Sequence, residues 1–235
     1  MSGQRQSVDV SRSELDLGPN ARVLFTDASH GNLSSIGGER AEHGAAARER
    51  LRELIGAERL ARGYQVHGTT VRIIRSAAQA EAGTPRARAD GQATALAGLA
   101  PMVLSADCLP VGLAAGSAVA MVHAGWRGLA AGVLERGVLA LRELSGADDA
   151  LYAAIGPGAG ACCYEVGEEV HEAFGQAARR GRNIDLRAIA RTRLLAAGAR
   201  HVADFDACTI CDERFFSHRR EGERAGRQAG VAWLS

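Results

Sequence analysis

Residues 102–144 read MVLSADCLPVGLAAGSAVAMVHAGWRGLAAGVLERGVLALREL, and this stretch decides the fold. Its first half contains short apolar runs at 102–104, 110–114 and 117–123, which are typical of buried strands. Its second half predicts an amphipathic helix over 129–144, because one face collects apolar residues at helical spacing, namely Leu129, Val133, Leu134, Val138 and Leu141. Strands followed by a covering helix favour an α/β domain.

The segments on either side continue this alternation. Strands are predicted over 23–26, over 63–74 with an interruption at Gly68, and over 152–155, 201–205, 214–218 and 231–234. Helices are predicted over 41–55, 166–180 and 186–197. Residues 1–20 are polar and predict a flexible N-terminal tail, and residues 21–235 predict a single α/β domain with a mixed sheet.

The composition argues against two classes of partner. The 235 residues carry a net charge of +1 and only 4% aromatic residues, so nothing favours nucleic acid or a membrane surface. The most apolar stretch, 109–124, is too short to span a bilayer. The N-terminus lacks the apolar core of a signal peptide, and the five cysteines are an odd number. We therefore expect a cytoplasmic protein with reduced thiols.

Three candidate metal ligands lie far apart in the sequence but in similar settings. His67, Cys108 and His123 each stand where a predicted strand meets a loop. Two imidazoles and one thiolate form a zinc-type set with an open fourth position, which is typical of a catalytic zinc. Copper is the alternative metal, because it binds such ligands more tightly than zinc. A strand-end histidine or a buried lone cysteine is also commonly structural, so the shared context carries this hypothesis.

A candidate anion site follows His123 directly. The segment GWRG at 125–128 turns from a predicted strand into a predicted helix and presents Arg127 near free backbone N–H groups, which suits a phosphate. The alternative is that Gly128 only permits the turn and Arg127 is solvated. Asp107, next to Cys108, is interpreted either as an acceptor that orients a ligand histidine or as the partner of a nearby arginine.

Three further features permit a functional and a structural interpretation. Glu165 is a candidate general acid or base, or a hydrogen-bond acceptor for the substrate. The motif CTIC at 208–211 has the form of half a zinc knuckle, but the only other pair, Cys162 and Cys163, is adjacent rather than spaced, so structural cysteines are favoured. The run FFSHRR at 215–220 either closes over an anionic or aromatic ligand or is a core strand that ends in solvated charges.

Six motifs occur in order along the chain: QVHG at 65–68, ADG at 89–91, SADCLPV at 105–111, HAGWRG at 123–128, GP at 156–157 with CYEVG at 163–167, and FFSHRR at 215–220. From about residue 23 to the C-terminus, the chain resembles the YfiH-type family. That family was formerly labelled laccase-domain or multicopper polyphenol oxidase, and it is now described as purine nucleoside phosphorylase.

The resemblance implies a layered α/β/β/α fold and a single catalytic domain over 21–235. It implies a zinc held by His67, Cys108 and His123. It implies phosphorolysis of adenosine, inosine, guanosine and S-methyl-5′-thioadenosine, with phosphate as co-substrate, and deamination of adenosine to inosine. The phosphate would be held by Arg127 with Arg48 or Arg219. The chain departs from the family near its N-terminus, where TDASHGNL at 26–33 carries Asp27 in place of the usual arginine.

Other functions compete with this one. A copper-dependent polyphenol oxidase would need histidine pairs for a copper cluster, and the chain has seven scattered histidines without an H-x-H motif. A cysteine hydrolase would use Cys108 as nucleophile with His67 or His123 as base. A metal-held module would bind nucleosides without turnover. The expected assembly is a monomer or a small homo-oligomer.

Overall fold

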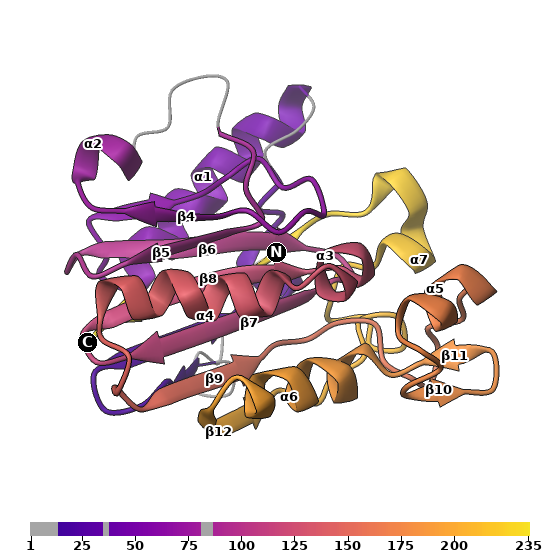
Figure 1. Ribbon diagram of the computed structural model, residues 1–235. Helices are drawn as coiled ribbons and strands as arrows, with labels where there is room; N and C mark the ends of the chain where they lie inside the picture. Colours follow the sequence, from indigo (N-terminus) through magenta and orange to yellow (C-terminus); the bar gives the residue numbers. More distant parts are fainter. Residues whose placement is uncertain (1–13, 35–37, 81–86) are drawn as a thin grey trace.

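The computed structural model describes residues 14–34, 38–80 and 87–235. Two mixed β-sheets lie face to face, with helices on both outer sides (Figure 1). The layers run helix, sheet, sheet, helix. This arrangement confirms the predicted α/β class with mixed sheets and the layered α/β/β/α fold implied by the family resemblance. No helix among the described residues combines the length and the apolar character needed to cross a membrane.

The five-stranded sheet has the order β1-β2-β13-β6-β3. Its strands are antiparallel except for the parallel pair β6–β3, and their bounds are β1 Glu14–Asp16, β2 Ala21–Phe25, β13 Gln228–Leu234, β6 Leu99–Ser105 and β3 Arg59–Ala61. Helix α1 (Gly38–Leu54) covers its outer face, where Ala47 and Leu51 pack with Met102 and Val231.

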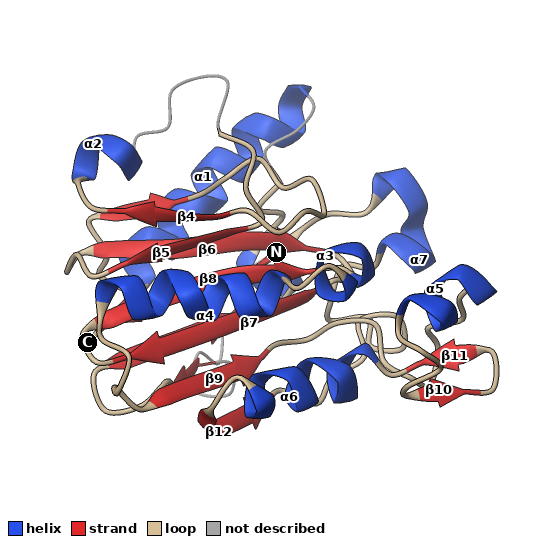
Figure 2. Cartoon of the chain, in the orientation of Figure 1, coloured by secondary structure: helices blue, strands red, loops and turns tan. Residues whose placement is uncertain are grey.

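The six-stranded sheet has the order β12-β9-β7-β8-β5-β4. The outer pairs β12–β9 and β5–β4 are parallel and the inner pairs antiparallel, with bounds β12 Ala199–Asp204, β9 Leu151–Ile155, β7 Leu109–Ala115, β8 Ala118–Ala124, β5 Gly91–Thr94 and β4 Val71–Ile74. Helices α4 (Val133–Leu144) and α6 (Leu186–Ala196) cover its outer face (Figure 2).

The remaining elements are short: α2 Ala77–Ala80, α3 Trp126–Ala130, α5 Glu168–Ala173, α7 His218–Glu221, the hairpin β10 Arg179–Arg180 and β11 Asn183–Ile184, and the 3-10 turns Ala28–His30 and Gly222–Arg224.

Strand β8 contributes to two cores because its side chains alternate between faces. Val119 and Met121 lie between the two sheets with residues of β2 such as Phe25. Ala120 and Val122 lie in the other core, beneath α4. Every residue of β7 and β8 is buried, and His123 near the end of β8 is the one polar side chain in the two strands.

Strand pairing brings the candidate site together at one edge of the six-stranded sheet. Leu109 pairs with Ala124 and Gly91 pairs with Val122, so the segments just before β7, just before β5 and at the end of β8 lie side by side. These segments carry Cys108, Asp90 and His123, respectively.

Several predicted elements need correction. The helix predicted over 166–180 ends at Ala173, because Gly175, Gln176 and Ala178 have positive φ angles of 57°, 63° and 58°, and the chain then forms the β10–β11 hairpin. The helix predicted over 129–144 begins earlier and is split into α3 and α4 at Gly132, whose φ is 94°.

Other corrections concern strands and the tail. Residues 214–218 form turns and the start of α7 rather than a strand, because the Ser217 side chain caps that helix. Of the region 63–74, only β4 is a strand. Residues 14–20 are not a flexible tail, since β1 pairs with β2 and Leu17 is buried; residues 1–13 lie outside the described part of the chain.

Replacing Leu134 by Ala should lower the free energy of unfolding by about 2–5 kcal/mol. Its side chain is only 1% exposed and packs in the core between α4 and the six-stranded sheet. The control Leu139→Ala removes the same atoms from the same helix at a position that is 58% exposed. It should change the stability by less than about 0.5 kcal/mol. Urea unfolding measures both, and equal losses would contradict this assignment of the faces of α4.

Candidate metal centre

The three predicted ligands converge although they come from separate segments. One ligand atom from each of His67, Cys108 and His123 lies within 4.8 Å of the other two. The Cys108 Sγ is 3.7 Å from the His67 Nε2, and the two imidazole centroids are 4.9 Å apart at an interplanar angle of 71°. His123 is buried and His67 is exposed, so the group is closed on one side and open on the other.

The buried carboxylate of Asp90 organises two of the three side chains. Its Oδ1 lies 2.9 Å from the His123 Nδ1, so that ring nitrogen donates to Asp90 and Nε2 keeps its lone pair for a metal. The same carboxylate accepts backbone N–H groups from Val66, His67 and Gly68, at distances from 2.8 to 3.2 Å. The loop that carries His67, which has a φ of 58°, is therefore held by the partner of His123.

Two glycines allow the segments to approach this closely. A Cβ at Gly125 would lie 2.7 Å from the His67 Cδ2 and 2.9 Å from the Cys108 Sγ. A Cβ at Gly128 would lie 2.8 Å from the carbonyl oxygen of Gly68. All three distances are too short for a side chain, so the sequence GWRG lets α3 rest against the two ligand loops.

Cys108 and His123 carry opposite charges, and each shifts the pKa of the other. Burial raises the pKa of the Cys108 thiol, but the neighbouring His123 and His67 side chains outweigh that effect and lower it to about 6. Burial lowers the pKa of His123, but the Cys108 thiolate and the Asp90 carboxylate raise it to about 9. Near neutral pH Cys108 is thus a thiolate, the form that binds metals, whereas the His123 ring is protonated and must release its Nε2 proton when a metal binds.

The donor set fits zinc. Two imidazoles and one thiolate leave a fourth coordination position, and Asp90 supplies the carboxylate that metal-ligating histidines usually contact. Within the described residues, this is the one group of three or more potential ligands that contains histidine.

A cavity of about 980 Å³ lies beside the trio. That volume is at the upper end of the range of about 300–1,000 Å³ typical of small-molecule sites. Its lining combines the three ligands with aromatic and basic side chains, among them Tyr64, Trp126, Tyr164, His218, Arg62, Arg127, Arg219 and Arg227.

The predicted arginines take different places. Arg127 and Arg219 line the cavity and stack on aromatic rings, with Arg127 Cζ 4.3 Å from the Trp126 centroid and Arg219 Cζ 4.8 Å from that of Tyr164. Arg48 is not among the lining residues. Its Nη1 donates to the carbonyl oxygens of Leu33 and Ser34 at 2.8 and 2.7 Å, so it shapes the loop that carries Ser34 to the cavity wall.

Two acidic residues singled out in the sequence contact groups other than the trio. Glu165 does not line the cavity; its half-exposed carboxylate pairs with Arg182. Asp107 accepts from the Thr209 hydroxyl and from the backbone N–H of Arg219, both at 2.7 Å, and so orients no histidine of the trio. The residue that does so is Asp90, which the sequence shows only as part of the ADG motif at 89–91. Its ADG motif was the available signal.

Comparisons with known proteins find relatives that match most of the chain. Residues 23–235 match the family described as "Multi-copper polyphenol oxidoreductase laccase". A protein of Xylella fastidiosa named "Purine nucleoside phosphorylase" is 40% identical over 243 residues, which cover 96% of this chain and 92% of the relative. "Purine nucleoside phosphorylase YfiH" of Escherichia coli K12 is 37% identical over 185 residues, which cover 72% of each protein.

Solved structures show the same fold. Neisseria meningitidis protein NMB0706 superposes with a TM-score of 0.80 at 31% identity, covering 95% of this chain and 99% of that one. YlmD from Geobacillus stearothermophilus gives a TM-score of 0.78 at 27% identity, covering 94% and 92% of the two chains.

Replacing Asp90 by Asn should weaken zinc binding by about 10- to 100-fold, because the amide is a poorer acceptor for the His123 N–H and for the 66–68 loop. Competition with a chromophoric chelator measures the affinity. Asp148→Asn, in the exposed loop before β9, is the matched control. Wild-type affinity in the Asp90 variant would refute the role of this carboxylate.

Replacing Gly125 by Ala should reduce zinc affinity at least about tenfold, since the new methyl group displaces His67 and Cys108. The control is Gly146→Ala, whose Cβ would meet its nearest atom, Asp149 Oδ2, at an ordinary 3.5 Å. The same competition assay applies to both. If both variants bind zinc as the parent does, close approach at residue 125 is not required.

Proposed function

We propose a function from one premise: the chain belongs to the multi-copper polyphenol oxidoreductase laccase family, in which its curated relatives are named purine nucleoside phosphorylases. The protein is then a zinc-dependent purine nucleoside phosphorylase. Its substrates are adenosine, inosine, guanosine and S-methyl-5′-thioadenosine with phosphate, and it also deaminates adenosine. The observation that carries the proposal is the arginine-lined cavity beside the His67–Cys108–His123 trio.

The charge of the cavity supports an anionic co-substrate. The lining of the cavity contains four arginines and only two carboxylates, those of Asp107 and Glu223. Both oxygens of Asp107 already accept hydrogen bonds. Burial lowers the pKa of Arg227, yet a guanidinium stays protonated at neutral pH. The net positive lining attracts phosphate, and a planar guanidinium binds phosphate oxygens in pairs.

The aromatic lining supports a purine base. Tyr164 and Trp126 present rings to the cavity, each stacked with an arginine. A purine packs on such rings through its flat face, which gives affinity without selecting one base over another. This is consistent with a set of several nucleosides as substrates.

In phosphorolysis, the C1′–N9 bond of the nucleoside breaks as a phosphate oxygen bonds to C1′, giving a free purine and ribose 1-phosphate. Arg127 and Arg219 would hold the phosphate next to the sugar, which replaces a bimolecular encounter by a positioned one. His67, Cys108 and His123 would hold the zinc, and Asp90 would keep His123 in the tautomer that binds it. When bound, zinc supplies a Lewis acid at the side of the cavity.

One observation favours a second candidate, a cysteine hydrolase. The Cys108 Sγ lies 3.7 Å from the His67 Nε2, and the pKa of Cys108 is lowered to about 6, as in an activated nucleophile. Such an enzyme would keep its activity after chelation and lose it on alkylation of Cys108.

The deciding experiment incubates the purified protein with adenosine and phosphate and resolves the products by chromatography. Adenine with ribose 1-phosphate supports phosphorolysis, and inosine supports deamination. Both products should disappear in Cys108→Ala and persist in His43→Ala, an exposed histidine of α1. Metal analysis of the same sample distinguishes zinc from copper. A sample that contains zinc but forms neither product would refute the proposal.

Replacing Arg127 by Gln should raise the KM for phosphate by about 10- to 100-fold and leave that for the nucleoside nearly unchanged. The reason is that a hydrogen bond to a charged group contributes about 1.5–3 kcal/mol. Arg136→Gln, on the exposed side of α4, is the control. Initial rates at varied phosphate measure the effect. An equal rise in the KM for phosphate and the KM for the nucleoside would contradict a specific role of Arg127 in phosphate binding.

A further inference from the structure

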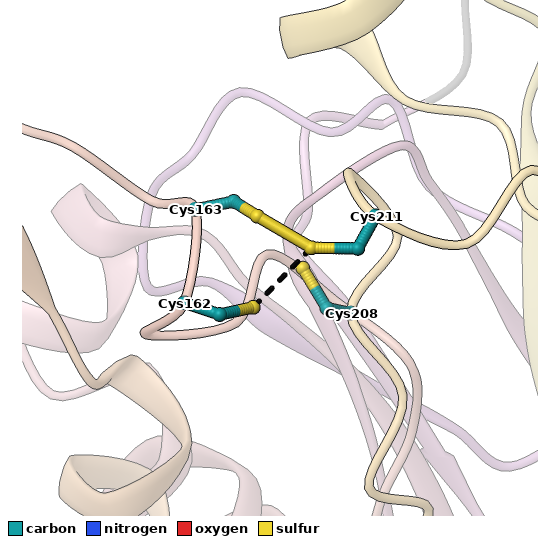
Figure 3. Close-up of side chains that lie close together, drawn as sticks. All are labelled: Cys162, Cys163, Cys208 and Cys211. Carbon is teal, nitrogen blue, oxygen red and sulfur yellow. Dashed lines mark hydrogen bonds between the residues drawn. A yellow bond between two sulfur atoms is a disulfide. The ribbon is translucent and has the colours of Figure 1, made fainter.

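Four cysteines meet at a second place in the fold, apart from the trio. Cys162 and Cys163 lie in the loop after β9, and Cys208 and Cys211 lie in the loop after β12 (Figure 3). Strands β9 and β12 are parallel neighbours, so their following loops leave the sheet at the same edge. The four Sγ atoms all lie within 4.8 Å of one another.

The contacts within this cysteine cluster link all four sulfurs. Cys163 and Cys211 form a disulfide in this structure, with Cα atoms 7.1 Å apart. The Cys162 Sγ is 3.3 Å from the Cys211 Sγ, and the Cys208 Sγ accepts the backbone N–H of Gly160 at 3.2 Å. The disulfide therefore uses two of the four sulfurs and leaves the other two directly beside it.

This arrangement fits a tetrahedral metal better than a single disulfide. Disulfide-bonded cysteines usually have Cα atoms about 4.4–6.8 Å apart, and this pair lies beyond that range. Four thiolates bound to zinc at about 2.3 Å lie roughly 3.8 Å from one another. The observed limit of 4.8 Å is close to that spacing, and both loops supply two ligands each.

The local backbone is shaped for thiolate ligands. The CTIC segment turns back on itself, with the Asp212 N–H donating to the Cys208 carbonyl oxygen at 3.0 Å. On the other loop, the N–H groups of Cys163 and Tyr164 both donate to the Gly160 carbonyl oxygen, which folds the chain tightly at the adjacent cysteines. A Cβ at Gly160 would lie 3.2 Å from the Cys208 Sγ and 3.3 Å from the Cys162 Sγ, so a side chain there would crowd the cluster.

We propose that Cys162, Cys163, Cys208 and Cys211 form a second metal site, which binds Zn²⁺ through four thiolates and has a structural role. The sequence argument against a zinc knuckle rested on the adjacency of Cys162 and Cys163, and the tight turn removes that objection. The disulfide is the oxidised form of the site. A dithiol that donates two electrons and two protons converts it to two thiols, and binding of zinc then releases the thiol protons to solvent.

The site would brace one wall of the neighbouring cavity. Thr209, between the two cysteines of the CTIC segment, donates its hydroxyl to Asp107, and Ala159 donates its N–H to the Asp107 carbonyl oxygen. Asp107 has a φ of 91° and directly precedes Cys108. Tyr164, which lines the cavity, directly follows Cys163. Zinc in the cysteine cluster would thus hold the loop that carries a ligand of the trio.

The test separates this site from the trio by removing the latter. The full chain with His67→Ala, Cys108→Ser and His123→Ala is reduced with a phosphine, loaded with zinc, freed of excess metal and analysed for zinc per chain. We expect one zinc, and none after the further changes Cys208→Ser and Cys211→Ser. Cobalt in place of zinc should give the intense charge-transfer absorption of a tetrahedral tetrathiolate. A folded trio variant that retains no zinc, or iron in preference to zinc, would overturn the proposal.

A second measurement uses the unaltered chain and does not depend on the folding of a variant. Cys162 and Cys211 are exposed, so their free thiols would react readily with iodoacetamide. In the reduced, zinc-loaded protein we expect all four cysteines to be protected and to become alkylated only after chelation, as read by peptide mass spectrometry. Fast alkylation of Cys162 and Cys211 with zinc present would refute the site, whatever the enzyme assay shows.

Discussion

The carboxylate of Asp90 is the constraint on which the candidate site depends. It lies fully buried just before β5, where an uncompensated negative charge would be costly. The His123 ring and three consecutive backbone N–H groups of the 66–68 loop compensate that charge. The pKa of Asp90 is lowered, since burial raises it but these hydrogen bonds have the larger combined effect. One ionised carboxylate therefore fixes the orientation of the His123 ring and the left-handed backbone conformation at His67.

Much of the fold follows from local patterns in the sequence. Strands β7 and β8 are apolar except for His123 and are joined by a tight turn at Gly116, so their pairing is readable from residues 109–124. The trio could be identified because each ligand stands at a strand end. What the pattern does not contain is the pairing of distant strands, which decides that the loops before β5 and β7 meet. The ADG motif marks Asp90, but the role of its carboxylate depends on that long-range pairing.

The errors have the same physical origin. The segment 166–180 has helical composition, but backbone at Gln176 and Ala178 adopts positive φ, which no periodicity predicts. The sequence also does not indicate that the side chain of Glu165, beside the cysteines, turns to Arg182 on the surface. The four cysteines of the cluster look unrelated in sequence because β9 and β12 are separated by two helices and a hairpin. In each case, long-range packing outweighs local preference.

The double role of β8 has a consequence for altering this protein. One face of the strand completes the core between the sheets, the other completes the core under α4, and its end carries His123. A change in the strand therefore disturbs one hydrophobic core or the other and also affects the position of His123, a candidate metal ligand. Redesign of the reaction would succeed more readily in the cavity wall formed by the 62–65 loop and the segment 218–227, which can vary while the scaffold stays intact.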